Sequence, residues 1–113
     1  MLDDLIIFRK AYELLKYLYP VVEGFPKSQR FLLAQRLECS ALAFLEHVMI
    51  ANAARDKSVE LEKADLELEK LRLFARLSHE YNFIGIRQYE AISKQTAELG
   101  RLLGGWKAKF SGK

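Results

Sequence analysis

The sequence predicts an all-α protein, an up-down-up-down antiparallel four-helix bundle. Apolar residues recur at helical spacing along most of the 113 residues. No stretch alternates β-branched and polar residues in the way that a half-buried strand requires. Three short segments rich in turn-forming residues, at 24–26, 55–58 and 82–85, divide the chain into four amphipathic helices. Because turns this short join antiparallel neighbours, the four helices are expected to alternate in direction.

Length and composition are those of one globular domain, covering residues 1–113. Half of the residues are hydrophobic, which is enough for one continuous core, and 29% are charged with both signs represented. The net charge of +3 permits a nucleic acid or an acidic partner without requiring either.

The sequence also indicates where the protein acts. Cys39 is the single cysteine, so a disulfide framework is excluded and a reducing compartment is favoured. The N-terminal apolar run lacks the basic flank and the length of a secretion signal. The longest apolar stretch, Ala41 to Ala54, is interrupted by Glu46 and His47 and is too short to cross a membrane. We therefore expect a soluble cytoplasmic protein without a membrane partner.

The first helix is expected to begin at about Asp4, a suitable N-cap residue, and to end at the turn segment 24–26. Pro20 falls inside this helix, and because proline lacks a backbone N–H we expect a kink between Lys16 and Pro20. The predicted core face has apolar residues at 4-3-4-3 spacing: Ala11, Leu15, Leu18, Val22 and Phe25.

The second helix is expected from about Ser28 to Ala54 and is apolar on two sides. Leu42, Leu45 and Met49 lie well off the main stripe, so this helix is expected to be covered by more than its own bundle. The main stripe contains Leu33, Leu37, Ser40, Phe44, Val48 and Ala51.

The third and fourth helices complete the predicted bundle. The third opens at Ser58 with Glu60 and Glu62 in its first turn, where the helix dipole favours acids. The fourth keeps heptad spacing from Ile86 to Phe110. The predicted seams are Leu61, Ala64, Leu68, Leu71 and Ala75 in the third helix, and Tyr89, Ile92, Thr96, Leu99, Leu103 and Trp106 in the fourth.

Three of the six glycines, Gly100, Gly104 and Gly105, fall inside the fourth helix, whose apolar spacing continues through them. A glycine inside a helix costs about 1 kcal/mol relative to alanine, so these positions need a compensating role. A phosphate-binding loop is excluded, because Trp106 and Lys107 stand where Lys and Ser/Thr are required and no strand precedes. Gly100 and Gly104 share one helical face. We therefore expect the three glycines and Trp106 to pack against a neighbouring helix or subunit.

The residue patterns of the common enzyme and metal sites are absent from the sequence. A di-metal bundle requires Glu-x-x-His motifs, but Phe44 and Arg76 stand three residues before His47 and His79. The sequence has no Gly-x-Ser-x-Gly motif, and Cys39 has the apolar sequence neighbours of a structural thiol. We therefore expect no catalysis, no metal and no cofactor.

Charge is unevenly distributed along the chain. Residues 56–69 contain six acids and two bases, whereas residues 87–113 contain six bases and two acids. Such basic residues suit sequence-independent, salt-sensitive contacts to phosphates, although single ones usually keep a helix soluble. No aromatic residue interleaves with the stripe of Arg87, Lys94 and Arg101, so stacking on bases is not indicated. The candidate nucleic-acid contacts are Arg72 and Arg76, the stripe residues Arg87, Lys94 and Arg101, and the C-terminal Lys107 and Lys109.

Three stretches together carry a family resemblance: "YLYPVVEGFPKSQRF" (17–31), "LELEKLRLFARL" (66–77) and "ELGRLLGGWKAKF" (98–110). Their order and spacing resemble those of the accessory variability determinant (Avd) proteins of diversity-generating retroelements, over nearly the whole chain. The resemblance implies a small, basic, non-catalytic bundle that assembles into a homopentameric ring. It also implies that the ring binds the reverse transcriptase of the retroelement and its template RNA, and so supports mutagenic cDNA synthesis.

The resemblance also assigns roles to particular residues. Arg72 and Arg76 in the second stretch are implied to face the reverse transcriptase or its RNA, while Gly100, Gly104 and Gly105 in the third are implied to serve packing. A wider relative shares the fold: the four-helix-bundle proteins encoded in intervening sequences of large ribosomal RNA genes. The alternative function is therefore a structural or protein-interaction module of that type with no nucleic-acid role.

Overall fold

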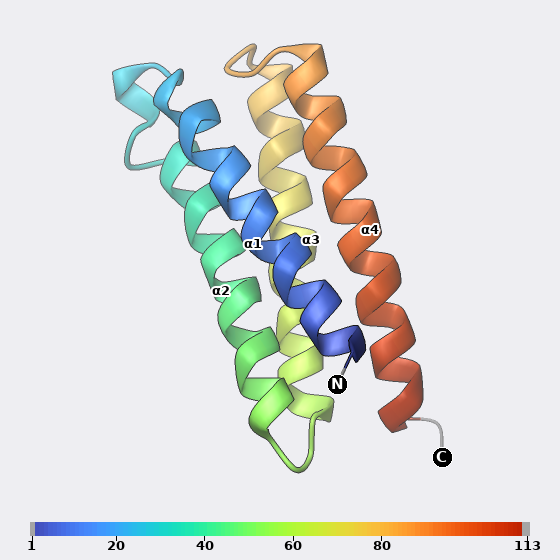
Figure 1. Cartoon of the computed structure of the whole chain (residues 1–113). Helices are drawn as coiled ribbons and strands as arrows, with labels where there is room; N and C mark the ends of the chain where they lie inside the picture. Colours follow the sequence, from blue (N-terminus) through green and yellow to red (C-terminus); the bar gives the residue numbers. More distant parts are fainter. Residues whose placement is uncertain (1, 112–113) are drawn as a thin grey trace.

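The computed structural model describes residues 2–111, with side chains described for residues 6–110. Four long helices run antiparallel to their neighbours in sequence (Figure 1): α1 (Leu2–Glu23), α2 (Leu33–Ala53), α3 (Ser58–Glu80) and α4 (Ile86–Ser111), with a short 3-10 helix η1 (Lys27–Gln29) between α1 and α2. The predicted all-α antiparallel four-helix bundle is confirmed. Helix α1 contacts α2 and α4, and α3 contacts the same two helices, so α2 and α4 lie on opposite corners of the bundle.

The core follows the predicted seams closely. Ala11, Leu18 and Phe44 are buried, as are all five residues of the predicted seam of α3. On α4 the seam is buried in its middle but not at its ends, because Ile86 is 54% exposed and Phe110 is 47% exposed. The buried part of that seam is Ile92, Thr96, Leu99, Leu103 and Trp106.

Two predicted helix boundaries are wrong. Helix α1 begins at Leu2, so Asp4 lies within it and is not its N-cap. The helix ends at Glu23, directly before the predicted turn segment 24–26. Its last turn tightens, because the N–H of Phe25 donates to the carbonyl of Val22 three residues back. Helix α2 begins at Leu33 rather than Ser28, because η1 and Leu32, whose backbone is neither helical nor extended (φ −119°, ψ −110°), intervene.

Proline does not end the first helix. Pro20 lies inside α1, which continues for three more residues to Glu23. Pro20 is exposed on the surface of the bundle, while Leu18 and Val21 on either side of it are buried. The core face of α1 therefore extends past the proline.

A network of side chains organises the turn between α2 and α3. The Lys57 Nζ donates to the carbonyls of Ala51 and Ala54 at 2.9 and 2.8 Å, and so caps the C-terminal end of α2. Asp56 Oδ1 accepts from both the N–H and the hydroxyl of Ser58, at 3.1 and 2.8 Å, where α3 begins. Ser58 is thus the first residue of α3, as predicted, with Asp56 as the acceptor at its start.

Candidate partner-binding surface

Arg72 and Arg76 lie on the side of α3 that faces α4. Both are exposed, and together with Glu69 and Leu73 of α3 and Tyr89 of α4 they line a surface cavity of about 400 Å³. Because they are four residues apart on one helix, their guanidinium groups share a face and can act together on one anionic partner. A carboxylate or a phosphate suits the planar donors of arginine.

Tyr89 is a member of this cavity that the sequence analysis did not include. Its ring stacks on that of His79, with ring centroids 4.8 Å apart and planes 4° from parallel. Tyr89 belongs to the apolar seam of α4 and not to the stripe of Arg87, Lys94 and Arg101, so the spacing of the stripe does not indicate it. Because the short turn at 82–85 makes α3 and α4 antiparallel, residues just before and just after it come side by side, and this signal could have placed Tyr89 next to Arg76.

The basic stripe of α4 forms a second and separate surface. Arg87, Lys94 and Arg101 are exposed, as predicted from their spacing. Lys94 lines a smaller cavity of about 160 Å³ between α1 and α4, whose other lining residues are Lys10, Glu13, Gln95 and Glu98. The structure therefore does not bring this stripe together with Arg72 and Arg76: the stripe leans toward α1, and the arginine pair lies beside the opposite edge of α4.

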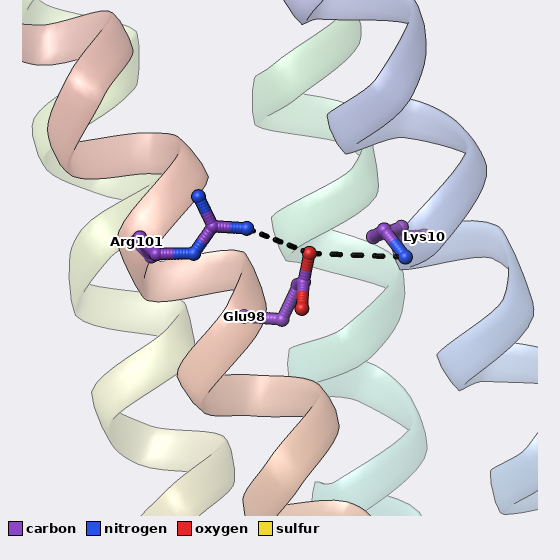
Figure 2. Close-up of polar contacts among 3 residues, drawn as sticks. All are labelled: Lys10, Glu98 and Arg101. Carbon is purple, nitrogen blue, oxygen red and sulfur yellow. Dashed lines mark hydrogen bonds and ion pairs between the residues drawn. The ribbon is translucent and has the colours of Figure 1, made fainter.

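Glu98 partly neutralises the basic stripe. Figure 2 shows its carboxylate between two cations, and Glu98 Oε2 lies 2.8 Å from Arg101 Nη2 and 3.8 Å from Lys10 Nζ on α1. Because the three side chains are at least one-third exposed, these are surface ion pairs of modest strength. The positive charge of Arg101 is therefore partly compensated by Glu98 before any partner binds.

The two C-terminal lysines of the predicted set differ in their surroundings. Lys107 is half-buried and its Nζ lies 3.1 Å from Asp65 Oδ2 and 3.4 Å from Glu62 Oε2, both on α3. The hydrogen bond with Asp65 raises the pKa of Lys107 above its ordinary value. Lys107 therefore ties α4 to α3, a structural role that the sequence analysis missed, and its contact with a partner stays a prediction. Lys109 is exposed.

The glycines of α4 do not share one environment. A methyl group added at Gly100 would lie 3.6 Å from Cδ2 of Leu68 on α3, an ordinary packing distance, whereas one added at Gly104 or Gly105 would meet no atom within 4 Å. Close packing between helices of the chain therefore does not hold for Gly104 and Gly105, because both face open space. Trp106 is buried in the core. Packing of the glycines against another subunit stays a prediction.

Comparison with known families decides the identity of this bundle. The model of the bAvd-like family matches residues 5–110, which is nearly the entire chain. The chain belongs to the bAvd-like family. The resemblance of the three sequence stretches to Avd proteins is thereby confirmed, and the bAvd-like match includes Arg72, Arg76 and the complete glycine segment of α4.

A solved structure supports the fold of this bAvd-like chain. A protein of unknown function of the S23 ribosomal protein family, from Bacteroides thetaiotaomicron, superposes with a TM-score of 0.84 at 19% sequence identity. The alignment covers 93% of this chain and 97% of the other. No curated protein matches the sequence. In the described part of the chain, no helix is long and apolar enough to span a membrane.

Proposed function

We propose that this chain is a non-catalytic accessory protein of a diversity-generating retroelement. It forms a homopentameric ring that binds the reverse transcriptase of the element and its template RNA, and in this way supports mutagenic cDNA synthesis. The observation that carries the proposal is the match of the bAvd-like family model to residues 5–110. Neither this family nor the S23 family is known as one of enzymes.

The cavity between α3 and α4 supports a binding role of this kind. Arg72 and Arg76 present ten N–H donors in two planar forks, the geometry that carboxylates and phosphates accept in pairs. Tyr89 adds a hydroxyl group and an aromatic edge to the same cavity. Glu69 also lines this cavity, and its negative charge repels closely spaced phosphates. The cavity is therefore suited to an anionic partner that contacts the two arginines from the side away from Glu69.

The stripe on α4 adds a weaker, long-range attraction for RNA. Arg87, Lys94 and Arg101 are exposed along more than half the length of α4, and a ring repeats them once per subunit. Contacts of lysine and arginine with phosphates release counterions, so binding through them weakens steeply as salt rises. The two surfaces therefore have different roles in this proposal. Arg72 and Arg76 on α3 make the oriented contacts, and the basic stripe of α4 raises the rate at which RNA associates.

A double substitution tests the arginine pair. Arg72→Ala with Arg76→Ala is expected to leave helicity and oligomeric state unchanged while abolishing co-purification with the reverse transcriptase or lowering RNA affinity at low salt. The measurements are pull-down with the tagged enzyme and fluorescence anisotropy with labelled template RNA across about 50 to 200 mM salt.

A matched control removes the same charge elsewhere. Lys27→Ala with Arg30→Ala deletes two exposed cations at the turn between α1 and α2 and is expected to bind normally. If both double variants lost the same amount of binding affinity, the loss would follow from the lower net charge and not from the position of Arg72 and Arg76. Wild-type protein that binds neither RNA nor reverse transcriptase at low salt would favour the alternative, a protein-interaction module of the ribosomal RNA intervening-sequence type.

A further inference from the structure

The cavity between α3 and α4 combines hydrogen-bond donors with an acceptor. Arg72 and Arg76 supply donors only, whereas Glu69 supplies a carboxylate that only accepts. Tyr89 adds a hydroxyl that does both, and Leu73 completes the lining with an apolar side chain. A ligand that matches this cavity therefore needs an anionic group for the arginines and N–H donors for the carboxylate.

The charged groups of this cavity follow one another along α3 in a fixed order. Glu69, Arg72 and Arg76 stand at positions i, i+3 and i+7, so they share one side of the helix. At a rise of about 1.5 Å per residue they span about 10 Å along its axis. The carboxylate therefore belongs to one end of the cavity, the first guanidinium to its middle, and the second to the end nearest the turn into α4.

Glu69 and Arg72 do not neutralise each other. Among the residues with described side chains, no hydrogen bond or ion pair joins either side chain to the other or to a third residue, and the same holds for Arg76. By contrast, Glu67 and Lys70 have the same spacing on the same helix, and Glu67 Oε2 lies 3.1 Å from Lys70 Nζ. The charged groups of the cavity are thus open to a ligand.

Tyr89 is held in the wall of the cavity by His79. The two rings stack with centroids 4.8 Å apart and planes 4° from parallel. His79 belongs to the last turn of α3, and its buried Nδ1 has no hydrogen-bond partner among the described residues. Ring stacking, and not a hydrogen bond of that atom, therefore positions the pair. Tyr89 lines the cavity at the end of Arg76, which stands three residues before His79.

A simple anion does not match this order of groups. A free phosphate, or the side chain of an aspartate or glutamate, offers only acceptors, and its negative charge is repelled by Glu69. A nucleotide differs, because it has an anionic phosphate at one end and a base with N–H donors at the other. The volume of about 400 Å³ is within the range of about 300 to 1,000 Å³ that small-ligand sites occupy.

Among the four RNA bases, guanine matches the cavity best. Its Watson–Crick edge has two neighbouring N–H donors, the ring imino group and the exocyclic amino group, which suit the two oxygens of one carboxylate. Its other edge has the acceptors O6 and N7, which the planar fork of an arginine contacts as a pair. Uracil has no exocyclic amino group, and in adenine and cytosine the amino group stands beside an acceptor that a carboxylate repels.

We propose that this cavity binds one unpaired guanine nucleotide of RNA. Glu69 accepts the two N–H donors of the base, and Arg72 donates to O6 and N7. Arg76 and the hydroxyl of Tyr89 hold the phosphate. The inference rests on the proposed function for RNA as the partner, while the choice of base rests on the groups in the cavity. Because the Watson–Crick edge is engaged, the guanine has to be unpaired, as in the loops and single strands where proteins read RNA sequence.

A guanosine analogue tests the contact with Glu69. A short fluorescent oligouridine with one central guanosine is compared, by anisotropy at about 100 mM salt, with the same strand carrying inosine, which lacks the exocyclic amino group. We expect the wild-type protein to bind the guanosine strand about tenfold more tightly than the inosine strand, and Glu69→Ala to bind the two strands with equal affinity. Equal affinities in the wild type, or a Glu69→Ala variant that keeps the preference, overturn the proposal.

Two controls separate base recognition from net charge. Glu46→Ala removes one exposed carboxylate from α2, outside this cavity, and should keep the preference for guanosine. The analogue 7-deazaguanosine lacks N7, so it should weaken binding to the wild type but not to Arg72→Ala. Circular dichroism of each variant checks that the helices are retained.

The failure of this inference is distinguishable from the failure of the proposed function. RNA binding that depends on Arg72 and Arg76 but is equal for all four bases would overturn guanine recognition and leave the proposed function in place. Binding of the reverse transcriptase through the two arginines, without any binding of RNA, would assign the cavity to a protein partner and likewise overturn the inference. Binding of neither partner at low salt would instead contradict the proposed function.

Discussion

The Lys107 Nζ of α4 donates a hydrogen bond to Asp65 Oδ2 of α3 across 3.1 Å, near the C-terminal end of the bundle. The second acid, Glu62, lies 3.4 Å from the same ammonium group. This contact joins residues 42 positions apart and turns a lysine of the basic C-terminal segment into a tie between two helices.

Replacing Lys107 by methionine should lower the free energy of unfolding by about 0.5 to 1 kcal/mol, because partly exposed ion pairs contribute in that range. The raised pKa of Lys107 means that this contribution is complete below the ordinary lysine pKa and is lost as the pH rises through the pKa of the folded state. Urea unfolding at pH 7 and above pH 10 measures both effects. A loss that does not shrink at high pH would contradict the charge-based explanation, and Lys94→Met serves as the control on the exposed stripe.

The contact between His47 and Glu60 should make stability depend on acid pH. The hydrogen bond from His47 lowers the pKa of Glu60, so the contribution of the ionised carboxylate is present above the ordinary pKa and is lost as the pH falls through the lowered pKa. We expect Glu60→Gln to be less stable than the wild type at pH 7, with a difference that shrinks toward pH 3. Urea midpoints at several pH values provide the measurement, and a constant difference would contradict the assignment.

Alanine substitutions at Gly104 and Gly105 should stabilise the helix. Both positions lie inside α4 with open space where a methyl group would be added, so the gain in helix propensity, about 0.5 to 1 kcal/mol per site, is not offset by a clash. Thermal unfolding followed by circular dichroism is the measurement. If either substitution dissociates the proposed ring, that glycine lies at a subunit contact.

Trp106 and Phe110 occupy the same predicted seam but should differ sharply in their effect on stability. Trp106 is 3% exposed, and Trp106→Ala should cost about 3 to 5 kcal/mol, since it empties a large core site. Phe110 is 47% exposed and lies over the ammonium group of Lys57 at 5.6 Å, so Phe110→Ala should cost about 1 kcal/mol or less. Chemical unfolding of both variants by circular dichroism tests the contrast, and equal costs would mean that the seam is packed to its end.

The sequence predicted the helices well because each has its own apolar period. The seam of α3 from Leu61 to Ala75 is buried residue for residue, since side chains three and four apart necessarily share one face of a helix. Boundaries were predicted less well. The apolar periodicity predicts too early a start for α2, because nothing in the sequence from Ser28 onward distinguishes a 3-10 turn from an α-helix.

What the sequence by itself determined is the class of fold, the family and the exposed position of the stripe residues Arg87, Lys94 and Arg101, because these depend on local spacing and on motifs read along one chain. What the tertiary structure decided is which residues from different helices meet. Tyr89 beside Arg72 and Arg76, Asp65 against Lys107, and the separation of the α4 stripe from the α3 pair all follow from the antiparallel packing of α3 on α4 and of α4 on α1. The physical reason is that helical periodicity specifies which side of a helix a residue occupies, whereas the height and identity of the residue opposite depend on how the complete core packs.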